Sequence, residues 1–186
     1  MKLNKLILNH YNRILQCFPP EEWEDRGTYW LSKSPQGTNI WHSCRKFRLT
    51  ASNFGAAIGK SIFTSPLDIA LDIANIKPKS FTDENKAVMK HGVDTEPKAR
   101  EWYSHHFKVQ VREVGLAVPK WEVRIGASVD GEVLGTNGII EIKSPLEMYR
   151  PLQEHKKKIE NGWKPPPFYH KHIWETHYAQ MQGCMK

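Results

Sequence analysis

The segment that decides the fold is GASVDGEVLGTNGIIEIKSP, residues 126–145. It is rich in Val, Ile and Gly, and its apolar residues alternate with polar ones, which is typical of β-strands. Residues 135–138, Gly-Thr-Asn-Gly, form a turn signal that separates an earlier strand from a later one. Successive side chains of a strand point to opposite faces, so we expect Glu141 and Lys143 on one face and the neighbouring isoleucines on the other.

Two acids approach each other if these strands pair. Asp130 closes the first strand and Glu141 lies within the second. Carboxylates at close range repel unless a proton or a cation joins them, and a hard divalent cation such as Mg²⁺ or Mn²⁺ suits them. Lys143 beside them could hold an attacking water or stabilise charge on a phosphate. A Glu-x-Lys pair alone is more often a surface ion pair of little energy, so both interpretations stay open at this point.

The remaining pattern predicts helices on either side of a sheet. We expect helices over residues 50–59, 65–76 (capped by Ser65, with Pro66 at its first position), 83–107 (kinked or restarted at Pro97), 146–160 and from 170 onward. Residues 109–118, 123–134 and 138–145 are expected to form an antiparallel meander. This order predicts an α+β domain, in which helices flank a small, mostly antiparallel central sheet.

Composition indicates an intracellular protein with a polyanionic partner. The chain has 186 residues and a formal net charge of +7, and its pI is about 9.3, which favours nucleic acid as the partner. No apolar run reaches the roughly 18 residues that span a bilayer, and the N-terminal residues are too polar for a signal peptide. The three cysteines are far apart and lack CxxC spacing, which argues against a cysteine-built zinc or iron–sulfur site.

Several short motifs occur in a recognisable order. They are WHSCRKFRLTAS (41–52), MKHGVDTEPKARE (89–101), GASVDG (126–131), the Glu-Ile-Lys of 141–143 and HYAQMQGCM (177–185). Together they resemble the PD-(D/E)XK nuclease superfamily and, more narrowly, its phage lambda exonuclease-like or YqaJ viral recombinase group. The resemblance implies a restriction-endonuclease-like core over 41–186, preceded by an N-terminal helical extension over 1–40. The family usually continues beyond the last motif, so the chain is either a compact member or a fragment.

The resemblance also implies roles for individual residues. Glu96, Asp130 and Glu141 would gather one or two Mg²⁺ or Mn²⁺ ions, with the Ile142 carbonyl as a further ligand and Lys143 positioning the water. The phosphate and DNA contacts would be Arg48, Ser52, Ser128, Tyr178, Gln180 and Gln182, the first three at a 5′ end. Simpler roles stay open for three of them: Ser52 as a helix cap, Arg48 as the partner of an acid, and Gln182 as a solvated side chain.

The implied function is a metal-dependent DNA nuclease. The resemblance favours a 5′-to-3′ exonuclease on double-stranded ends, with or without a 5′ phosphate, in viral or phage recombination or DNA processing. It is compatible with a homo-oligomer, with a single-strand-annealing or helicase partner, and with the host cytoplasm or a viral or phage replication compartment. No membrane partner is expected. The alternatives are a PD-(D/E)XK endonuclease, a Cas4-like end-processing enzyme without an iron–sulfur cluster, and a non-catalytic DNA-binding recombination module. Three gathered acids argue against the last.

Overall fold

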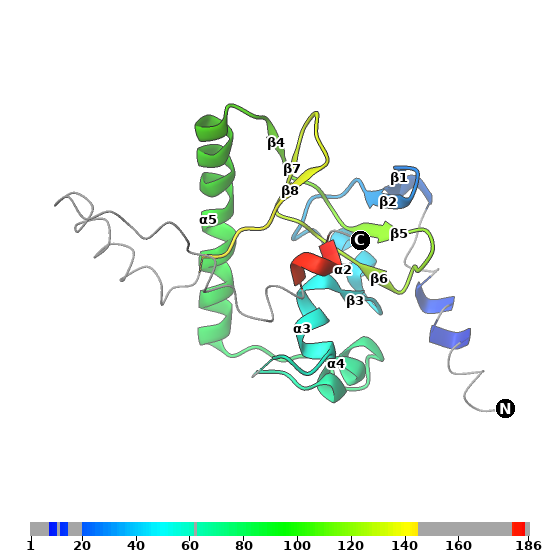
Figure 1. Cartoon of the computed structure of the whole chain (residues 1–186). Coiled ribbons are helices and arrows are strands. Elements are labelled where there is room, and N and C mark those ends of the chain that lie inside the picture. The colour runs from blue at the N-terminus through cyan, green and yellow to red at the C-terminus, as the bar shows by residue number, and fades with distance from the viewer. Residues whose placement is uncertain (1–7, 11, 15–19, 62, 145–179, 185–186) are drawn as a thin grey trace.

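The computed structural model describes residues 8–10, 12–14, 20–61, 63–144 and 180–184. Short strands and helices are mixed along the chain, and the α+β prediction is confirmed. The long helix α5 stands beside one small sheet, a second sheet lies on the far side of that sheet, and α3 and α4 lie below (Figure 1). Within the described residues, no helix combines the length and apolar character needed to cross a membrane.

The described helices are mostly short. They are η1 (Pro20–Glu22), α2 (Asn39–Arg45), η2 (Ala51–Asn53), α3 (Phe54–Ala57), α4 (Pro66–Ile73) and α5 (Asp83–Phe107), and residues 8–10, 12–14 and 180–184 are also helical. The predicted start of α4 is confirmed, because Ser65 forms a capping box with Asp68 and Pro66 follows it. The helix predicted over residues 50–59 begins later than expected, because a strand and a 3₁₀ turn precede α3.

Helix α5 has the predicted bounds, and clear signals mark both ends. Thr82 and Asn85 form a capping box at its start, and Lys108 ends it in the left-handed conformation at φ 54°. Of the two outcomes predicted at Pro97, the restart is wrong, since α5 runs through this residue as one helix, and the kink stays a prediction. Proline at this position removes one backbone hydrogen bond, to the carbonyl of Val93. Val93 is 63% exposed, so water can satisfy that carbonyl.

The strands form three small sheets. They are β1 (Trp23–Asp25), β2 (Tyr29–Ser32), β3 (Leu49–Thr50), β4 (Val111–Arg112), β5 (Ala117–Pro119), β6 (Ile125–Gly126), β7 (Gly131–Val133) and β8 (Gly138–Ile140). The sheet orders are β1-β2-β5 and β4-β7-β8, both antiparallel, and β3-β6, which is parallel. A bridge between Ala117 and Ala127 connects β5 to the chain that follows β6.

The predicted meander is only partly correct, because its first two long strands each divide between sheets. The first becomes β4 and β5, the second becomes β6 and β7, and the third ends at Ile140. The chain leaves one sheet for the other at Gly115, where an added Cβ would lie 2.5 Å from the carbonyl oxygen of Ser32. Such close backbone contact requires glycine, and it redirects the strand.

The N-terminal region is part of the domain. The predicted helical extension over 1–40 is wrong from Trp23 onward, because β1 and β2 form a hairpin that pairs with β5. Trp23 joins Cys44, Leu116 and Val118 in the buried hydrophobic cluster. The β1–β2 hairpin therefore packs on the domain expected over 41–186, and the boundary at residue 40 stays a prediction.

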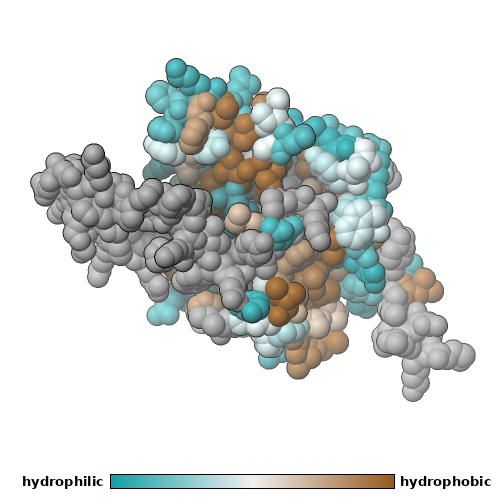
Figure 2. Space-filling view, in the orientation of Figure 1, coloured by the Kyte–Doolittle hydropathy of each residue, from teal (hydrophilic) through white to brown (hydrophobic). Residues whose placement is uncertain are grey.

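Apolar side chains also remain exposed. Ile58, Phe63 and Leu67, at or near α3 and α4, are 64%, 80% and 67% exposed. Hydrophobic residues are visible over this lower part of the molecule in Figure 2. The interior of the domain therefore lies elsewhere, between the β1-β2-β5 sheet and α2.

Candidate active site

The β7–β8 hairpin brings Asp130 and Glu141 to the same end of the sheet. Gly131 pairs with Ile140, so the two acids flank the last pair of the ladder. The Asp130 amide donates to the carbonyl of Ile140 at 3.0 Å. The Ile142 amide in turn donates to Asp130 Oδ2 at 2.5 Å. The predicted approach of these two acids is therefore confirmed, although Glu141 lies just after the strand.

Glu141 is held by two donors on one of its oxygens. Lys143 Nζ donates to Glu141 Oε1 at 2.5 Å, and Gln180 Nε2 donates to the same oxygen. Glu141 and Lys143 therefore share a face, as the alternation predicted. The Glu141 side chain is 12% exposed and that of Lys143 is 38% exposed, which leaves the amine within reach of solvent.

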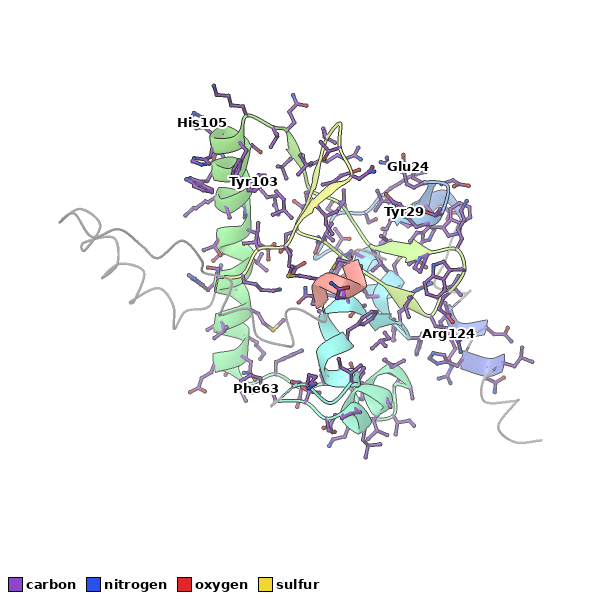
Figure 3. The ribbon with its side chains drawn as sticks, in the orientation of Figure 1. Glu24, Tyr29, Phe63, Tyr103, His105 and Arg124 are labelled. Carbon is purple, nitrogen blue, oxygen red and sulfur yellow. The ribbon has the colours of Figure 1, made fainter. Side chains whose placement is uncertain are left out.

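Glu96 belongs to α5 and faces the hairpin. Arg100, one turn later, lies 4.0 Å from Glu96 and donates to the Asp130 carbonyl at 3.0 Å. Tyr103 lies on the sheet side of α5, whereas His105 lies on the opposite side (Figure 3). Glu96, Arg100 and Tyr103 follow the spacing of one helix face, so this face presents Glu96 to the other acids.

All three acids are easier to protonate than usual. Burial raises the pKa of Asp130, Glu141 and Glu96 above their ordinary values. The charge of Asp130 raises the pKa of both glutamates further. Lys143 lowers the pKa of Asp130 and Glu141, and Arg100 lowers those of Asp130 and Glu96, without reversing the shift. The acids therefore interact electrostatically as a group, which we call the acid centre.

The acid centre is not a preformed metal cage. Across the described ranges, no three His, Cys, Asp or Glu side chains are arranged to hold a metal ion. That Glu96, Asp130 and Glu141 gather a metal ion therefore stays a prediction, and ion binding would require their side chains to rearrange. Each acid lies next to a cation or donor of the protein: Asp130 accepts from the Ile142 amide, Glu141 accepts from Lys143, and Glu96 lies 4.0 Å from Arg100.

The chemistry of the acid centre nevertheless fits a divalent cation. Glu141 Oε2 is buried and has no hydrogen-bond partner among the described residues. A buried acceptor without a partner is costly, and a hard cation would satisfy it. The three carboxylates also outnumber the two cationic groups that act on them, Lys143 and Arg100.

A second polar cluster surrounds Arg45 at the end of α2. Its guanidinium lies within 3.3–3.5 Å of the hydroxyls of Ser128, Thr50 and Ser52 and 4.3 Å from the ring centroid of Trp41. Burial lowers the pKa of Arg45 to about 10. Within the described part of the chain, it has no carboxylate partner. We call this cluster the arginine pocket.

The arginine pocket fits an anion. Trp41 Nε1 donates to Ser128 Oγ at 3.0 Å, which fixes that hydroxyl. The hydroxyl contacts of Arg45 are long for hydrogen bonds, so its N–H groups can still take stronger acceptors. A partly buried cation without a carboxylate, next to several hydroxyl donors, is suited to phosphate oxygens.

Arg48 does not take part in this pocket. It is 2% exposed, and its guanidinium donates to the carbonyls of Val123 and Cys44. This burial favours a structural role for Arg48 over the predicted phosphate contact, and its partners among the described residues include these main-chain carbonyls. Arg45 is the residue that the sequence analysis missed. A signal was present, because Arg45 follows Trp41 by four residues and so shares its helix face.

The other predicted residues divide between the two clusters. Ser52 and Ser128 contact Arg45, and Gln180 contacts Glu141. Ser52 caps no helix, since α3 begins after Asn53 without a side-chain cap. Gln182 is half-buried and Tyr178 lies outside the described residues.

Helical residues 180–184 connect the two clusters. Gln180 reaches Glu141. One turn later, an added Cβ on Gly183 would lie 2.6 Å from the Phe54 ring and 3.2 Å from Ala51 Cβ. Phe54 and Ala51 flank Ser52 in sequence. Residues 180–184 therefore touch both the acid centre and the chain that carries the arginine pocket.

Comparison with known proteins identifies the family. A family model for the YqaJ-like viral recombinase domain matches residues 40–185. The chain belongs to the YqaJ-like viral recombinase domain family. The predicted resemblance is thus confirmed, and both clusters lie within the matched YqaJ-like domain.

Solved structures agree with this assignment. The alkaline exonuclease LHK-Exo from Laribacter hongkongensis matches with a TM-score of 0.55 and 29% identity, over 80% of this chain and 67% of that one. Its complex with dAMP matches with the same score and identity, over 78% of this chain and 66% of that one. The YqaJ-like chain thus spans about two thirds of LHK-Exo. A search of curated proteins gave no significant match.

Proposed function

We propose that this YqaJ-like domain is a metal-dependent DNA nuclease that degrades double-stranded DNA from its ends in the 5′-to-3′ direction. The observation that carries the proposal is the acid centre, where buried carboxylates of raised pKa surround a paired lysine at the end of the β7–β8 hairpin. The name of the structural neighbour, an alkaline exonuclease, supports the same reaction class.

The acid centre supplies the groups that phosphodiester hydrolysis needs. Glu96, Asp130 and Glu141, with the Ile142 carbonyl, would hold one or two Mg²⁺ or Mn²⁺ ions. When bound, such an ion lowers the pKa of water and neutralises charge on the scissile phosphate. Glu141 holds Lys143 Nζ beside this position. Lys143 would then orient the attacking water or donate to a phosphate oxygen as charge develops.

The arginine pocket would bind a phosphate at a DNA end. Ser128 lies two residues before Asp130, so their Cα atoms are at most about 7 Å apart. Phosphates of one strand advance about 3.4 Å per nucleotide along the duplex axis. Even with the added length of the side chains, a phosphate bound by Arg45 and Ser128 would lie within a few nucleotides of the acid centre, as end-directed cleavage requires. The net charge of +7 favours the rest of the DNA backbone.

The deciding experiment compares DNA forms and metals. The purified chain is mixed with linear duplex carrying a 5′ phosphate or a 5′ hydroxyl, and with closed circular duplex, in Mg²⁺, Mn²⁺ or EDTA. We expect nucleotide release from linear ends only, faster with a 5′ phosphate and abolished by EDTA. Cleavage of the closed circle would favour an endonuclease, and DNA binding without cleavage would favour a non-catalytic module.

A pair of variants tests the assignment of the lysine. Lys143→Ala should lower the cleavage rate by about 10²- to 10⁴-fold while leaving DNA binding largely intact. Glu132→Gln is the matched control, because Glu132 lies in the same hairpin but pairs with Arg112 at 2.7 Å. Equal loss in both variants would mean that hairpin stability, and not the chemistry of Lys143, is being measured.

A further inference from the structure

Helix α5, which carries Glu96, has no buried side chain to fix its position against the sheet. None of its 25 residues is buried. Val88, Met89 and Val93 are 49%, 53% and 63% exposed. A helix held by few buried apolar contacts has a weakly determined height and rotation. Yet a metal ligand must be placed to within a fraction of an ångström. Polar contacts must therefore contribute to the placement of Glu96.

Arg100, one turn after Glu96 on α5, contacts the chain beside the helix. Its guanidinium donates to the Asp130 carbonyl at 3.0 Å and to Glu113 Oε2 at 3.1 Å. Its side chain is 14% exposed. Its Cδ lies 3.6 Å from the position of an added Cβ on Gly131, so the aliphatic stem passes over this glycine. Arg100 thus joins α5 to the start of β7 and, through Glu113, to the chain after β4.

Asp130 connects Arg100 to the acid centre through its main chain and its side chain. The Asp130 amide donates to the Ile140 carbonyl, and Asp130 Oδ2 accepts from the Ile142 amide. These two bonds enclose Glu141 from either side. A shift of Asp130 relative to Arg100 would therefore move Glu141 as well.

His91, which precedes Glu96 on α5, makes a second polar contact, with Ser144. Its Nε2 lies 3.2 Å from Ser144 Oγ, just after Lys143. His91 and Arg100 are nine residues apart, about 14 Å along the helix axis at about 1.5 Å per residue, and Glu96 lies between them. Arg100 thus contacts Asp130, at the beginning of the segment 130–144 that carries Asp130, Glu141 and Lys143. His91 contacts Ser144, at the end of that segment.

We propose that His91 and Arg100 are positioning residues that fix the height of Glu96 against Asp130 and Glu141. Arg100 is the main one, because it makes two hydrogen bonds from a largely buried guanidinium, whereas His91 makes one from a half-buried ring. Neither contacts the substrate. The proposal rests on the proposed function for its catalytic meaning, but the contacts themselves can be tested without DNA.

The first test measures hydrogen exchange of the Ile142 amide in the full chain without DNA or metal. Arg100→Gln should lower its protection by about tenfold, because Asp130 loses its anchor on α5. Arg100→Lys should recover part of the protection, since it keeps the charge and one donor. Arg112→Gln is the control, because it removes an arginine–glutamate pair between β4 and β7 outside the acid centre. Unchanged Ile142 protection in Arg100→Gln would overturn the role of Arg100.

The second test measures Mn²⁺ binding by the disappearance of the free-ion electron paramagnetic resonance signal. Arg100→Gln should weaken binding by about 10- to 100-fold, as loss of an outer partner of metal ligands does. His91→Leu and Ser144→Ala should each weaken it by about 2- to 10-fold, and by no more when combined. His105→Gln, on the opposite side of α5 (Figure 3), should leave it unchanged.

The outcomes separate this proposal from the proposed function. Wild-type affinity for Mn²⁺ in both Arg100→Gln and His91→Leu would overturn the positioning roles. A wild-type chain that binds no Mn²⁺ would refute the metal-dependent nuclease, while the exchange of Ile142 would still decide whether Arg100 positions Asp130. Thermal unfolding of each variant confirms that the fold is intact before either result is interpreted.

Discussion

The acid centre and the arginine pocket differ in how their charges are satisfied. In the acid centre, buried carboxylates exceed the neighbouring cations, and Glu141 Oε2 has no partner among the described residues. In the arginine pocket, one partly buried guanidinium is surrounded by hydroxyls and an indole, and no acid within the described ranges neutralises it. One cluster thus has an excess of negative charge and the other an excess of positive charge.

This difference indicates which ligand each cluster takes. Uncompensated buried charge is costly, and a fold retains it where a ligand of opposite sign offsets the cost. The acid centre therefore suits a cation and the arginine pocket suits an anion. Because residues 180–184 touch Glu141 at one end and Phe54 at the other, the two clusters share a structural support.

The largest effect should come from removing one charge of the acid centre. Asp130→Asn keeps an oxygen that can accept from the Ile142 amide, so the hairpin should fold normally. We expect cleavage to fall by more than about 100-fold, beyond the effect typical of an outer-shell change, because a metal ligand has lost its charge. Steady-state cleavage of linear duplex measures the loss. A variant with more than a tenth of wild-type activity would remove Asp130 from the metal site.

A smaller and more selective effect should come from the arginine pocket. Arg45→Ala should slow cleavage of 5′-phosphorylated ends by about 10- to 100-fold, which is the value of hydrogen bonds to a charged group. Ends with a 5′ hydroxyl should be nearly unaffected, because they lack the phosphate that Arg45 binds. Rates on the two substrates, measured in parallel, give the ratio. An equal loss on both ends would show that Arg45 acts on DNA in general, or on the fold.

Arg48 supplies the matched control for Arg45. Arg48→Met removes the donors to the Val123 and Cys44 carbonyls and should destabilise the domain by about 1–3 kcal/mol. That corresponds to a melting temperature lower by several degrees, at about 2–4 °C per kcal/mol for a chain of this size. The preference for a 5′ phosphate should remain. A lost preference with an unchanged melting temperature would return the phosphate role to Arg48.

The stabilisation of the fold by a bound metal ion should depend on pH if the ion binds at the acid centre. The folded-state pKa values of Glu96, Asp130 and Glu141 are raised, so folding favours their protonated forms. Their contribution to stability is therefore complete below the ordinary acid pKa values and is lost as pH rises through the raised ones. A divalent cation should offset this loss at alkaline pH and have little effect at acidic pH, where protons compete with it.

Thermal unfolding with and without Mn²⁺ measures this difference. At alkaline pH and an Mn²⁺ concentration about 100 times its dissociation constant, stabilisation should be about 2.7 kcal/mol, or roughly 5–10 °C. The increase should shrink as pH falls through the raised pKa values and should be absent in Glu141→Gln. An increase of equal size at acidic and alkaline pH would mean that the ion binds outside the acid centre.

Local sequence signals were enough to predict part of this arrangement. The cap of α4 at Ser65 is encoded within one helical turn, and the predicted bounds of α5 agree with the structure. The approach of Asp130 and Glu141 follows from the register of one hairpin with a short turn. These features depend on residues close together in the chain, where alternation, capping and turn chemistry act directly.

Long-range contacts account for what was missed. The division of the predicted strands depends on the approach of Gly115 to Ser32, and the inclusion of β1 and β2 depends on their pairing with β5. Arg45 and Arg48 have the same charge in the same motif, and only the fold buries one and directs the other to Ser128. The preference of each acid for a protein donor likewise depends on neighbours that periodicity does not identify.

The smallest predicted effect tests the link between the clusters. Gly183→Ala adds a Cβ that would lie 2.6 Å from the Phe54 ring, so residues 180–184 or Phe54 must shift. Such overpacking typically costs about 1–3 kcal/mol, and the shift should loosen the contact of Gln180 with Glu141. We expect a lower melting temperature and a loss of cleavage of only a few-fold, similar on both kinds of DNA end. Phe54→Leu in the same chain should relieve the crowding and restore both. If the double variant recovered stability but not cleavage, Gly183 would act on the acid centre by a route other than its packing against Phe54.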